Sequence, residues 1–453
     1  MSRLWFRQAL LPNGWSAAVR LTLADGRIAT VAPGVEPQPG DVRHAIGLPG
    51  LPNLHSHAFQ RAMAGRAERR VERADDFWLW RERMYQLAQA VQPQDLRAIA
   101  ALAYAEMLQA GFVRVGEFHY LHNAPDGRPY ADPGEMAVSL AAAAAETGIA
   151  LTLLPVFYAH AGFGGTPPNA GQTRFLNSLD SYARLLDASD AAICGLPGAV
   201  LGVAPHSLRA VTPAELAEVT ALRPAGPVHI HIAEQTREVE DCLAWSGQRP
   251  VEWLLAHAPV DRRWCLVHAT HVDAAETRAL AASAAAAGLC PITEANLGDG
   301  LFPAENFLAA GGQVGIGSDS NVLIDATEEL RLLEYGQRLT QRRRNVLAGP
   351  AGEPTAERLY HAALAGGGRA LGEDPPGLRP GAPASFVSLD AEHPALAEAA
   401  PDEYLSRWIF AAGRGAVDGV WVAGRQLVAQ GRHVRWPQIV ADYRAALTRL
   451  QAG

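Results

Sequence analysis

The sequence predicts an α/β fold, a (β/α)8 barrel of the TIM type with a small β-sandwich domain built from both termini. Two features of the chain point to this fold. Short apolar runs alternate with Ala-rich, helix-like segments through the middle of the chain, as buried parallel strands alternate with crossover helices. Both ends of the chain instead have the pattern of β-hairpins.

Eight apolar runs are candidates for barrel strands, and each is followed by a helix-like stretch or a longer loop. They cover residues 46–57, 112–120, 149–158, 199–207, 227–234, 264–270, 288–294 and 313–320. Eight such units predict a (β/α)8 barrel. A doubly wound sheet is the alternative, but no GxGxxG follows a strand, so the marker of a dinucleotide-binding fold is missing. The Ala-rich runs 139–145 and 280–287 are expected to be helical.

The termini predict the second domain. Residues 17–34 contain two strand-like runs joined through Asp25-Gly26, a pair typical of hairpin turns. Residues 383–390 and 419–434 have the same β pattern, and a helix with Pro437 near its start follows them. We expect three segments, namely 1–47 and 373–453, which build the β-sandwich and the terminal helix, and 48–372, which forms the barrel.

Composition restricts the class of protein. The chain has 453 residues, 49% of them hydrophobic, and its net charge of -8 gives no electrostatic support for binding nucleic acid. No uninterrupted apolar run reaches the roughly 18 residues of a membrane span, and the N-terminus lacks the apolar core of a signal peptide. We therefore expect a cytoplasmic protein. Four scattered cysteines without a CxxC pair argue against a disulfide framework or a cysteine-based zinc site.

The sequence contains no lysine, so all 39 basic residues are arginines. This excludes a Walker A phosphate loop, a Schiff-base enzyme and a pyridoxal phosphate enzyme, because each of them needs a lysine. It also excludes a dinuclear metal site bridged by a carboxylated lysine.

The first apolar run ends in two histidines. His55 and His57 are separated by one residue, so on a strand both side chains point to the same side. Neutral imidazoles that face one place can share a metal ion. The alternative is that one ring is a hydrogen-bonded core histidine while the other lies on the surface.

Polar residues also end the fifth, sixth and eighth runs, at the edge where a barrel keeps its chemistry. In HIHIAE, His231 lies closer to the carboxyl end and is the favoured ligand, whereas His229 is expected to be structural. Glu234 lies past the strand end, within reach of a water on a metal, although a helix N-terminal acid is the alternative. Taken alone, His268 resembles a core histidine and Asp319 a helix N-cap. Their occurrence in this order at four strand ends argues against coincidence.

The pattern resembles the amidohydrolase superfamily, with HxH on strand one, H-x-x-E after strand five, His on strand six and Asp on strand eight. The lysine-free chain is similar to the mononuclear deaminase branch, and residues 377–390 resemble the family's entry into its terminal sandwich, with Ser385 where Asp is usual. The resemblance covers nearly the whole chain. It implies a homodimer with one divalent metal per subunit, Zn²⁺, held by His55, His57, His231 and Asp319.

A narrower similarity is to the deiminases of this branch that act on N-formimino-L-glutamate. It rests on the segments 55–68, 116–122, 204–210, 229–235 and 318–321. It implies hydrolysis of a C=N carbon, with N-formyl-L-glutamate and ammonia as products, in histidine degradation. Glu234 would move a proton from water to the departing nitrogen. His268 and Asp319 would orient the water and stabilise the tetrahedral intermediate.

Such a substrate carries two carboxylates, so its site needs cations away from the metal. Arg209, after the fourth run, and Arg81, in the long insertion after the first, are the candidates, because a guanidinium can bind a carboxylate through two hydrogen bonds. The alternative for either arginine is a solvated surface charge. The resemblance also implies Gln60, Tyr120 and His206 as polar contacts to this small-molecule substrate.

Three alternative functions stay open. A deaminase of the same branch that acts on a purine or pterin ring would need aromatic stacking and amide-like readout of the base instead of two arginines. The same substrate could be cleaved at its other C–N bond, which would give glutamate and formamide. A metal-free barrel that serves as a binding module is the non-enzymatic alternative.

Overall fold

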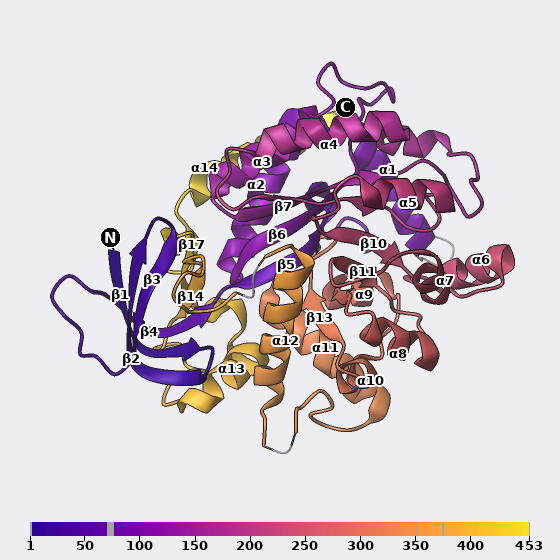
Figure 1. Ribbon diagram of the computed structural model, residues 1–453. Coiled ribbons are helices and arrows are strands. Elements are labelled where there is room, and N and C mark those ends of the chain that lie inside the picture. The colour runs from indigo at the N-terminus through magenta and orange to yellow at the C-terminus, as the bar shows by residue number, and fades with distance from the viewer. Residues whose placement is uncertain (1, 70–76, 351, 374–375, 453) are drawn as a thin grey trace.

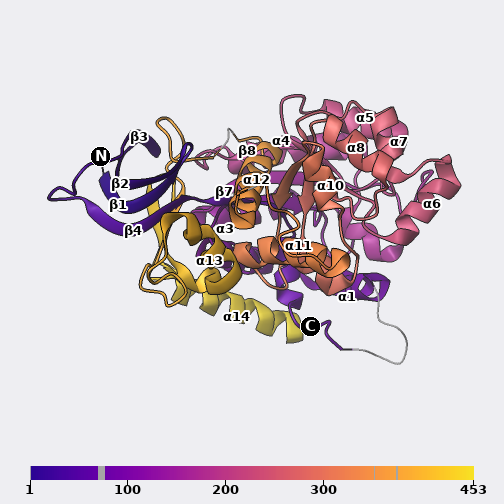
Figure 2. The ribbon, with the colours of Figure 1, turned by 90° about the horizontal axis from the view of Figure 1, so that it is seen from below.

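The computed structural model describes residues 2–69, 77–350, 352–373 and 376–452 of the chain. Figure 1 shows a barrel of strands surrounded by helices, and a separate sheet beside it at the N-terminal end. In Figure 2 the terminal sheet projects from one end of the molecule, while α14 runs back along the outside of the barrel. Arg449 of that helix donates to Asp95 at 2.8 Å and so fastens the C-terminus to the barrel.

The barrel consists of two parallel sheets that meet at two seams. The strand orders are β5-β6-β7-β8, with β9 paired to β7, and β10-β11-β12-β13. Isolated parallel bridges join Ser56 to Asp319 at one seam, and Val203 to Val228 and Ser207 to His231 at the other. The sheet is therefore closed, and the predicted (β/α)8 barrel is confirmed. Its strands are β5 (Leu51–Ser56), β6 (Phe112–His119), β7 (Ala150–Phe157), β8 (Val200–Leu201), β9 (Ala204–Pro205), β10 (Val228–Ile232), β11 (Trp264–His268), β12 (Ala286–Leu289) and β13 (Gln313–Ile316).

Helices cover the barrel and flank the terminal sheet. They are α1 (Phe77–Ala90), α2 (Pro93–Gln109), α3 (Glu135–Thr147), α4 (Leu179–Ile193), α5 (Pro213–Ala221), α6 (Thr236–Ser246), α7 (Pro250–His257), α8 (Ala274–Ala282), α9 (Pro291–Leu297), α10 (Ala304–Ala309), α11 (Ala326–Gln341), α12 (Thr355–Ala370), α13 (Tyr404–Arg407) and α14 (Trp436–Ala452). Among the described helices, none is long and apolar enough to cross a bilayer.

Both termini build the second sheet, as predicted. It has eight strands in the order β17-β16-β15-β14-β4-β1-β2-β3, so strands from the two ends of the chain meet where β14 pairs with β4. An antiparallel bridge between Arg27 and Pro383 brings β3 back toward the segment before β14, and the sheet curls over a core of its own. Its strands are β1 (Ser2–Leu11), β2 (Gly14–Ala24), β3 (Arg27–Ala32), β4 (Val42–Pro49), β14 (Phe386–Leu389), β15 (Val417–Val422), β16 (Arg425–Ala429) and β17 (Arg432–His433). Asp25 and Gly26 both have positive φ, which fits the predicted hairpin turn between β2 and β3.

Three predicted strands differ from the structure. The run 199–207 is interrupted after Leu201 and forms two short strands, β8 and β9. The run 46–57 divides at Gly50 into β4 of the terminal sheet and β5 of the barrel. A Cβ on Gly50 would lie 2.1 Å from a methyl carbon of Val113, so the crossing between the two sheets requires glycine here. The run 288–294 is a strand only as far as Leu289, because Pro291 begins α9 at a position where proline is favoured.

The Ala-rich run 280–287 is only partly helical, which corrects the prediction for that segment. Helix α8 ends at Ala282, Ala284 has φ 64°, and β12 begins at Ala286. Alanine has a high helix propensity, but the buried slot between β11 and β13 accepts small side chains in an extended backbone. The other Ala-rich run, 139–145, lies within α3 as predicted.

A buried ion pair near the amino-terminal end of the barrel gives a test of stability. Arg114 donates to the two oxygens of Glu373 at 3.0 and 3.1 Å, and its side chain is only 4% exposed. We expect Glu373→Gln to lower the free energy of unfolding by about 2–3 kcal/mol, because the buried guanidinium loses its counter-charge. Activity at 25 °C should be unchanged, because the pair lies at the opposite end of β6 from the candidate site.

Thermal melting checks this prediction. The matched control is Asp187→Asn, which breaks an ion pair to Arg223 in which the aspartate side chain is 83% exposed. Such an exposed pair contributes about 0–1 kcal/mol, so its loss should leave the melting temperature almost unchanged. Equal shifts in the two variants would contradict the stabilising role of the Arg114–Glu373 pair.

Candidate active site

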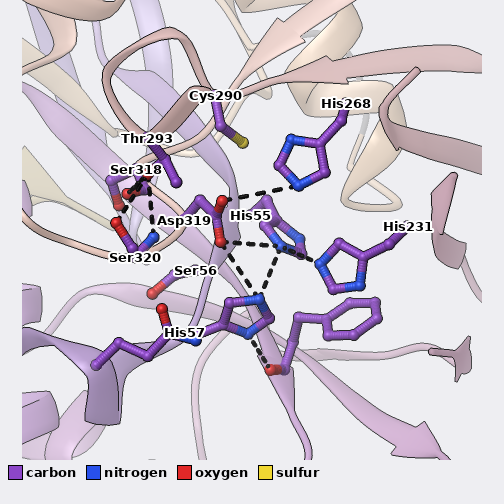
Figure 3. A network of polar contacts seen from close by, with 12 residues as sticks. His55, Ser56, His57, His231, His268, Cys290, Thr293, Ser318, Asp319 and Ser320 are labelled. Atoms are coloured by element: carbon purple, nitrogen blue, oxygen red, sulfur yellow. Dashed lines mark hydrogen bonds and ion pairs between the residues drawn. The ribbon is translucent and has the colours of Figure 1, made fainter. Parts of the chain in front are cut away.

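Three histidine side chains meet at the carboxyl ends of β5 and β10 (Figure 3). The Nε2 atom of His55 lies 3.2 Å from that of His57 and 3.0 Å from that of His231. All three side chains are buried. The two imidazoles of the HxH pair thus face one point, and the third comes from the opposite half of the barrel.

Hydrogen bonds to backbone carbonyls orient two of these rings. Nδ1 of His57 lies 2.9 Å from the carbonyl oxygen of Phe118, and Nδ1 of His231 lies 3.1 Å from that of His206. A carbonyl only accepts, so in both rings Nδ1 carries the hydrogen and donates it. The neutral rings therefore direct their Nε2 lone pairs toward the common point, which is the arrangement of metal-binding histidines.

Carboxylates and a fourth histidine surround the same point. Asp319 Oδ1 lies 3.3 Å from His57 Nε2 and 3.6 Å from His55 Nε2. On the other side of the point, His268 Nε2 is 3.7 Å from Asp319 Oδ2 and 3.7 Å from Glu234 Oε1. The four strand ends that the sequence singled out are thus brought together in one cluster, whereas His229 lies deeper and contacts the carbonyl of Ala370 at 2.7 Å.

Burial and charge set the protonation of the cluster. Burial, with the neighbouring histidines, lowers the pKa of His55 and His231 well below the usual range, and burial lowers that of His57 to about 3. These three rings are neutral at pH 7. Burial would lower the pKa of His268 as well, but the carboxylates of Glu234, Glu294 and Asp319 raise it to about 10. His268 is therefore positively charged and Nδ1 donates to Glu294 at 3.2 Å.

Two residues at the strand ends of the site have an unusual backbone conformation. Asp319 has φ 44° and His268 has φ 68°, in the left-handed region that non-glycine residues rarely occupy. Asn321 supports the turn after β13, since its side-chain amide donates to the carbonyls of His57 and Asp319 at 3.1 and 3.0 Å. Strained backbone held by such bonds is common at functional sites.

The histidine cluster forms one wall of a cavity of about 550 Å³ that opens to solvent. All five residues expected to contact substrate line this cavity together with the cluster, namely Gln60, Arg81, Tyr120, His206 and Arg209. Gln60 donates to the hydroxyl of Tyr120 at 2.8 Å, and this pair lies beside the HxH ligands. Sequence reasoning thus identified residues from several distant segments that share one cavity.

The two arginines that line the cavity come from different segments of the chain. Arg81 belongs to α1, and its guanidinium lies 4.4 Å from the ring centroid of Trp78. Arg209 is buried, with Nη2 3.7 Å from Glu238 Oε2, and its Nε has no hydrogen-bond partner among the described residues. A buried N–H donor without a partner is costly, so its presence beside a cavity points to an acceptor supplied by a ligand.

Several residues of the site were missed by sequence reasoning. Tyr158 lines the cavity, and its hydroxyl accepts from Gln172 at 2.7 Å. Glu294 orients His268, Asp299 accepts from the side chain of Gln235, and Glu238 contacts Arg209. None of these residues stands in a recognisable motif, and an acid near a helix start is more often only a helix-stabilising charge.

The donor set fits a divalent metal ion. One nitrogen from each of His55, His57 and His231 can reach a common point, since these atoms lie within 4.8 Å of one another. Asp319 adds a carboxylate oxygen, Oδ1, which lies 3.3 Å from His57 Nε2, and burial raises the pKa of this acid to about 7. Three imidazole lone pairs and a carboxylate are ligands that Zn²⁺ takes readily, and they leave room for a water.

Known protein families and a known relative match this chain over nearly its whole length. The profile of the amidohydrolase family matches residues 46–427, and that of the formimidoylglutamate deiminase HutF N-terminal domain matches residues 1–45. A formimidoylglutamate deiminase of Pseudomonas aeruginosa is 52% identical over 438 residues, which is 96% of each chain.

Solved structures also match this chain over its whole length. An amidohydrolase from Brucella melitensis is 54% identical, covers 100% of both chains and superposes with a TM-score of 0.97. An adenosine deaminase from Xanthomonas campestris, solved with bound zinc, shares the fold at 23% identity, with a TM-score of 0.82 and coverage of 100% of this chain and 98% of its own. The matches include both the barrel and the terminal sheet, and they establish that the chain belongs to the amidohydrolase family.

Proposed function

We propose that this chain is a formimidoylglutamate deiminase, which hydrolyses N-formimino-L-glutamate to N-formyl-L-glutamate and ammonia in histidine degradation. The observation that carries the proposal is the division of the cavity between two kinds of group. The three-histidine cluster with Glu234 borders the cavity, and Arg81 and the buried Arg209 line the same cavity. The histidine cluster with Glu234 suits hydrolysis of a C=N carbon, and the two arginines suit the binding of a dicarboxylate. The deiminase of Pseudomonas aeruginosa, 52% identical, supports the same activity.

The reaction needs an activated water. We propose one Zn²⁺ per subunit, held by His55, His57, His231 and Asp319, and when bound it would supply Lewis-acid activation of water near neutral pH. The backbone contacts of His57 and His231 keep the two imidazoles in the tautomer with a free Nε2. This part of the proposal predicts loss of activity on chelation and its return with added zinc.

Glu234 and His268 manage protons and charge. Glu234 takes the proton from the attacking water and gives it to the departing nitrogen, so that ammonia leaves and the carbon keeps the new oxygen. The position of its carboxylate supports this role, since Oε1 lies 3.7 Å from His268 Nε2 and the residue lines the cavity with the histidine cluster. Asp319 and His268 orient the water. His268, which is protonated, also stabilises the negative charge that develops on oxygen as the tetrahedral intermediate forms.

The two arginines and their neighbours bind the rest of the substrate. The Nε of Arg209, which lacks a hydrogen-bond partner among the described residues, can complete a pair of hydrogen bonds to one carboxylate, and Arg81 binds the other. Gln60, Tyr120 and His206 provide polar contacts near the reacting group. Because arginine is charged at every working pH, Arg81 and Arg209 can bind a dicarboxylate without changing their own protonation.

A ring deaminase of the same branch is the second candidate, and the aromatic lining favours it. Trp80, Tyr85, Tyr120, Tyr158 and Phe175 all border the cavity. Such side chains could stack on a purine or pterin ring. Two arginines would have no partner on an uncharged base, which is why the linear dicarboxylate is preferred.

Product analysis separates these activities. The zinc-loaded protein is incubated with N-formimino-L-glutamate and with a panel of purines and pterins, and ammonia, N-formyl-L-glutamate, formamide and glutamate are quantified. We expect ammonia and N-formyl-L-glutamate in equal amounts. Glutamate and formamide would show cleavage of the other C–N bond. Turnover of a ring substrate alone would refute the proposal.

The role of Glu234 is tested by Glu234→Gln, which keeps the size of the side chain and removes its basicity. We expect kcat to fall by about 10²- to 10⁴-fold while the metal content stays at the wild-type level. Elemental analysis of the same preparation reports the metal. A variant that retains zinc and wild-type kcat would exclude Glu234 as the proton carrier.

The two arginines are tested through KM. We expect Arg81→Met and Arg209→Lys each to raise KM for N-formimino-L-glutamate by about 10- to 100-fold, because a charged hydrogen bond is lost. Lysine at position 209 keeps a positive charge beside Glu238 but lacks the two-pronged geometry. The control is Arg83→Met on the same helix, since Arg83 donates to the carbonyl of Ala67 at 2.9 Å and does not line the cavity. An unchanged KM in both test variants would refute the assigned dicarboxylate site.

A further inference from the structure

One buried carboxylate contacts both halves of the site without being part of either. Glu238 lies in the first turn of α6 and its side chain is 1% exposed. It neither lines the cavity nor reaches the histidine cluster, so it has no contact with the reacting atoms. Among the described residues, its hydrogen bonds and ion pair nevertheless go to Glu234, to the neighbouring Ala233 and to Arg209.

The first contacts are to the turn that follows β10. One oxygen of Glu238 accepts from the backbone N–H of Ala233 at 3.1 Å, and the other accepts from the backbone N–H of Glu234 at 3.3 Å. Ala233 has φ 50°, in the left-handed region, so this turn needs external bonds to persist. These bonds hold the backbone from which the Glu234 side chain extends toward His268.

This arrangement differs from ordinary helix capping. In a capping box the acid at the third helical position accepts the backbone N–H of the N-cap residue. Here the N-cap is Gln235, and Glu238 extends past it to the two preceding residues. Stabilisation of the helix end alone would not need this longer reach.

The last contact of Glu238 is to Arg209, the residue proposed to bind a carboxylate of the substrate. Glu238 Oε2 lies 3.7 Å from Nη2 of Arg209, a residue that comes from the segment after β9. The guanidinium is thereby held from one side, while its Nε has no hydrogen-bond partner among the described residues. One oxygen atom of Glu238 thus lies between the backbone of Glu234 and the guanidinium of Arg209.

We propose that Glu238 is a positioning residue that sets the distance between the proton carrier Glu234 and the carboxylate-binding Arg209. The role rests on the proposed function of these two residues and deepens it. A substrate held by its carboxylate at Arg209 then presents its reacting carbon at a defined distance from Glu234, because one rigid carboxylate fixes both partners.

The test is Glu238→Gln, which keeps the shape but replaces one acceptor oxygen by an NH₂ group and removes the charge. We expect KM for N-formimino-L-glutamate to rise about tenfold and kcat to fall about tenfold, with unchanged zinc content. Glu240→Gln is the matched control, since Glu240 is an exposed acid on the same helix. It should leave both constants within twofold of the wild-type values.

A second comparison separates positioning from a general loss of structure. In an Arg209→Lys background, Glu238→Gln should change KM less than threefold, because no planar guanidinium is left to orient, while the loss in kcat persists. A KM effect that is undiminished in that background would overturn the proposal. Wild-type KM and kcat in the single variant would overturn it as well.

Two further outcomes are decisive. If Glu238→Gln fails to fold, Glu238→Asp replaces it, because the shorter acid keeps the charge but cannot reach both amides; unchanged kcat there refutes the role. A wild-type protein that does not turn over N-formimino-L-glutamate would refute the proposed function instead. The variants are then compared on the substrate that the wild type does turn over, where an unchanged kcat refutes the contact with Glu234.

Discussion

The barrel closes through the same backbone groups that carry the histidine cluster. At the seam between β5 and β13, the N–H of His57 donates to the carbonyl of Asp319 at 2.9 Å, and the N–H of Asp319 donates to the carbonyl of His55 at 2.9 Å. At the other seam, the N–H of His231 donates to the carbonyl of His206 at 3.0 Å. Closing the sheet therefore brings the candidate ligands together and holds the backbone of these residues in place.

This dependence explains why strained backbone is tolerated around the cluster. Left-handed residues such as Asp319 and His268 cost on the order of 1–3 kcal/mol each, which only well-bonded surroundings can offset. Beneath the seam, Asn53 donates to Ser318 at 2.7 Å, and Ser318 donates to Asn321 at 2.6 Å. The amides and hydroxyls of this buried chain bond to one another and to the strand ends, so the strain is held by the core and not by the ligand.

The sequence revealed the barrel and the cluster because both follow local rules. Buried parallel strands are apolar runs, and their carboxyl ends face one edge, so a histidine or aspartate at a strand end predicts its own location. The sequence did not predict roles for Glu238 and Glu294, because each contacts a partner that lies nearby only in the closed barrel. Local rules also failed at Gly50, where one apolar run serves two sheets, and at Pro291, where an apolar strand-like run becomes a helix.

The arrangement of charge around the cavity adds a constraint on how a substrate can enter. Among the residues that line the cavity, Glu234 and Asp319 belong to the strand ends of the histidine cluster, whereas Arg209 and Arg81 come from other segments of the chain. On the proposed function the substrate is itself divided in this way, since its amidine is a base and its two other ends are carboxylates. The reverse orientation would bring the basic amidine against the guanidinium groups of Arg81 and Arg209, and like charges facing one another are repelled in a buried cavity. The same separation of charge that binds the substrate thus selects the end that is hydrolysed, and a neutral ring would gain no such direction from it.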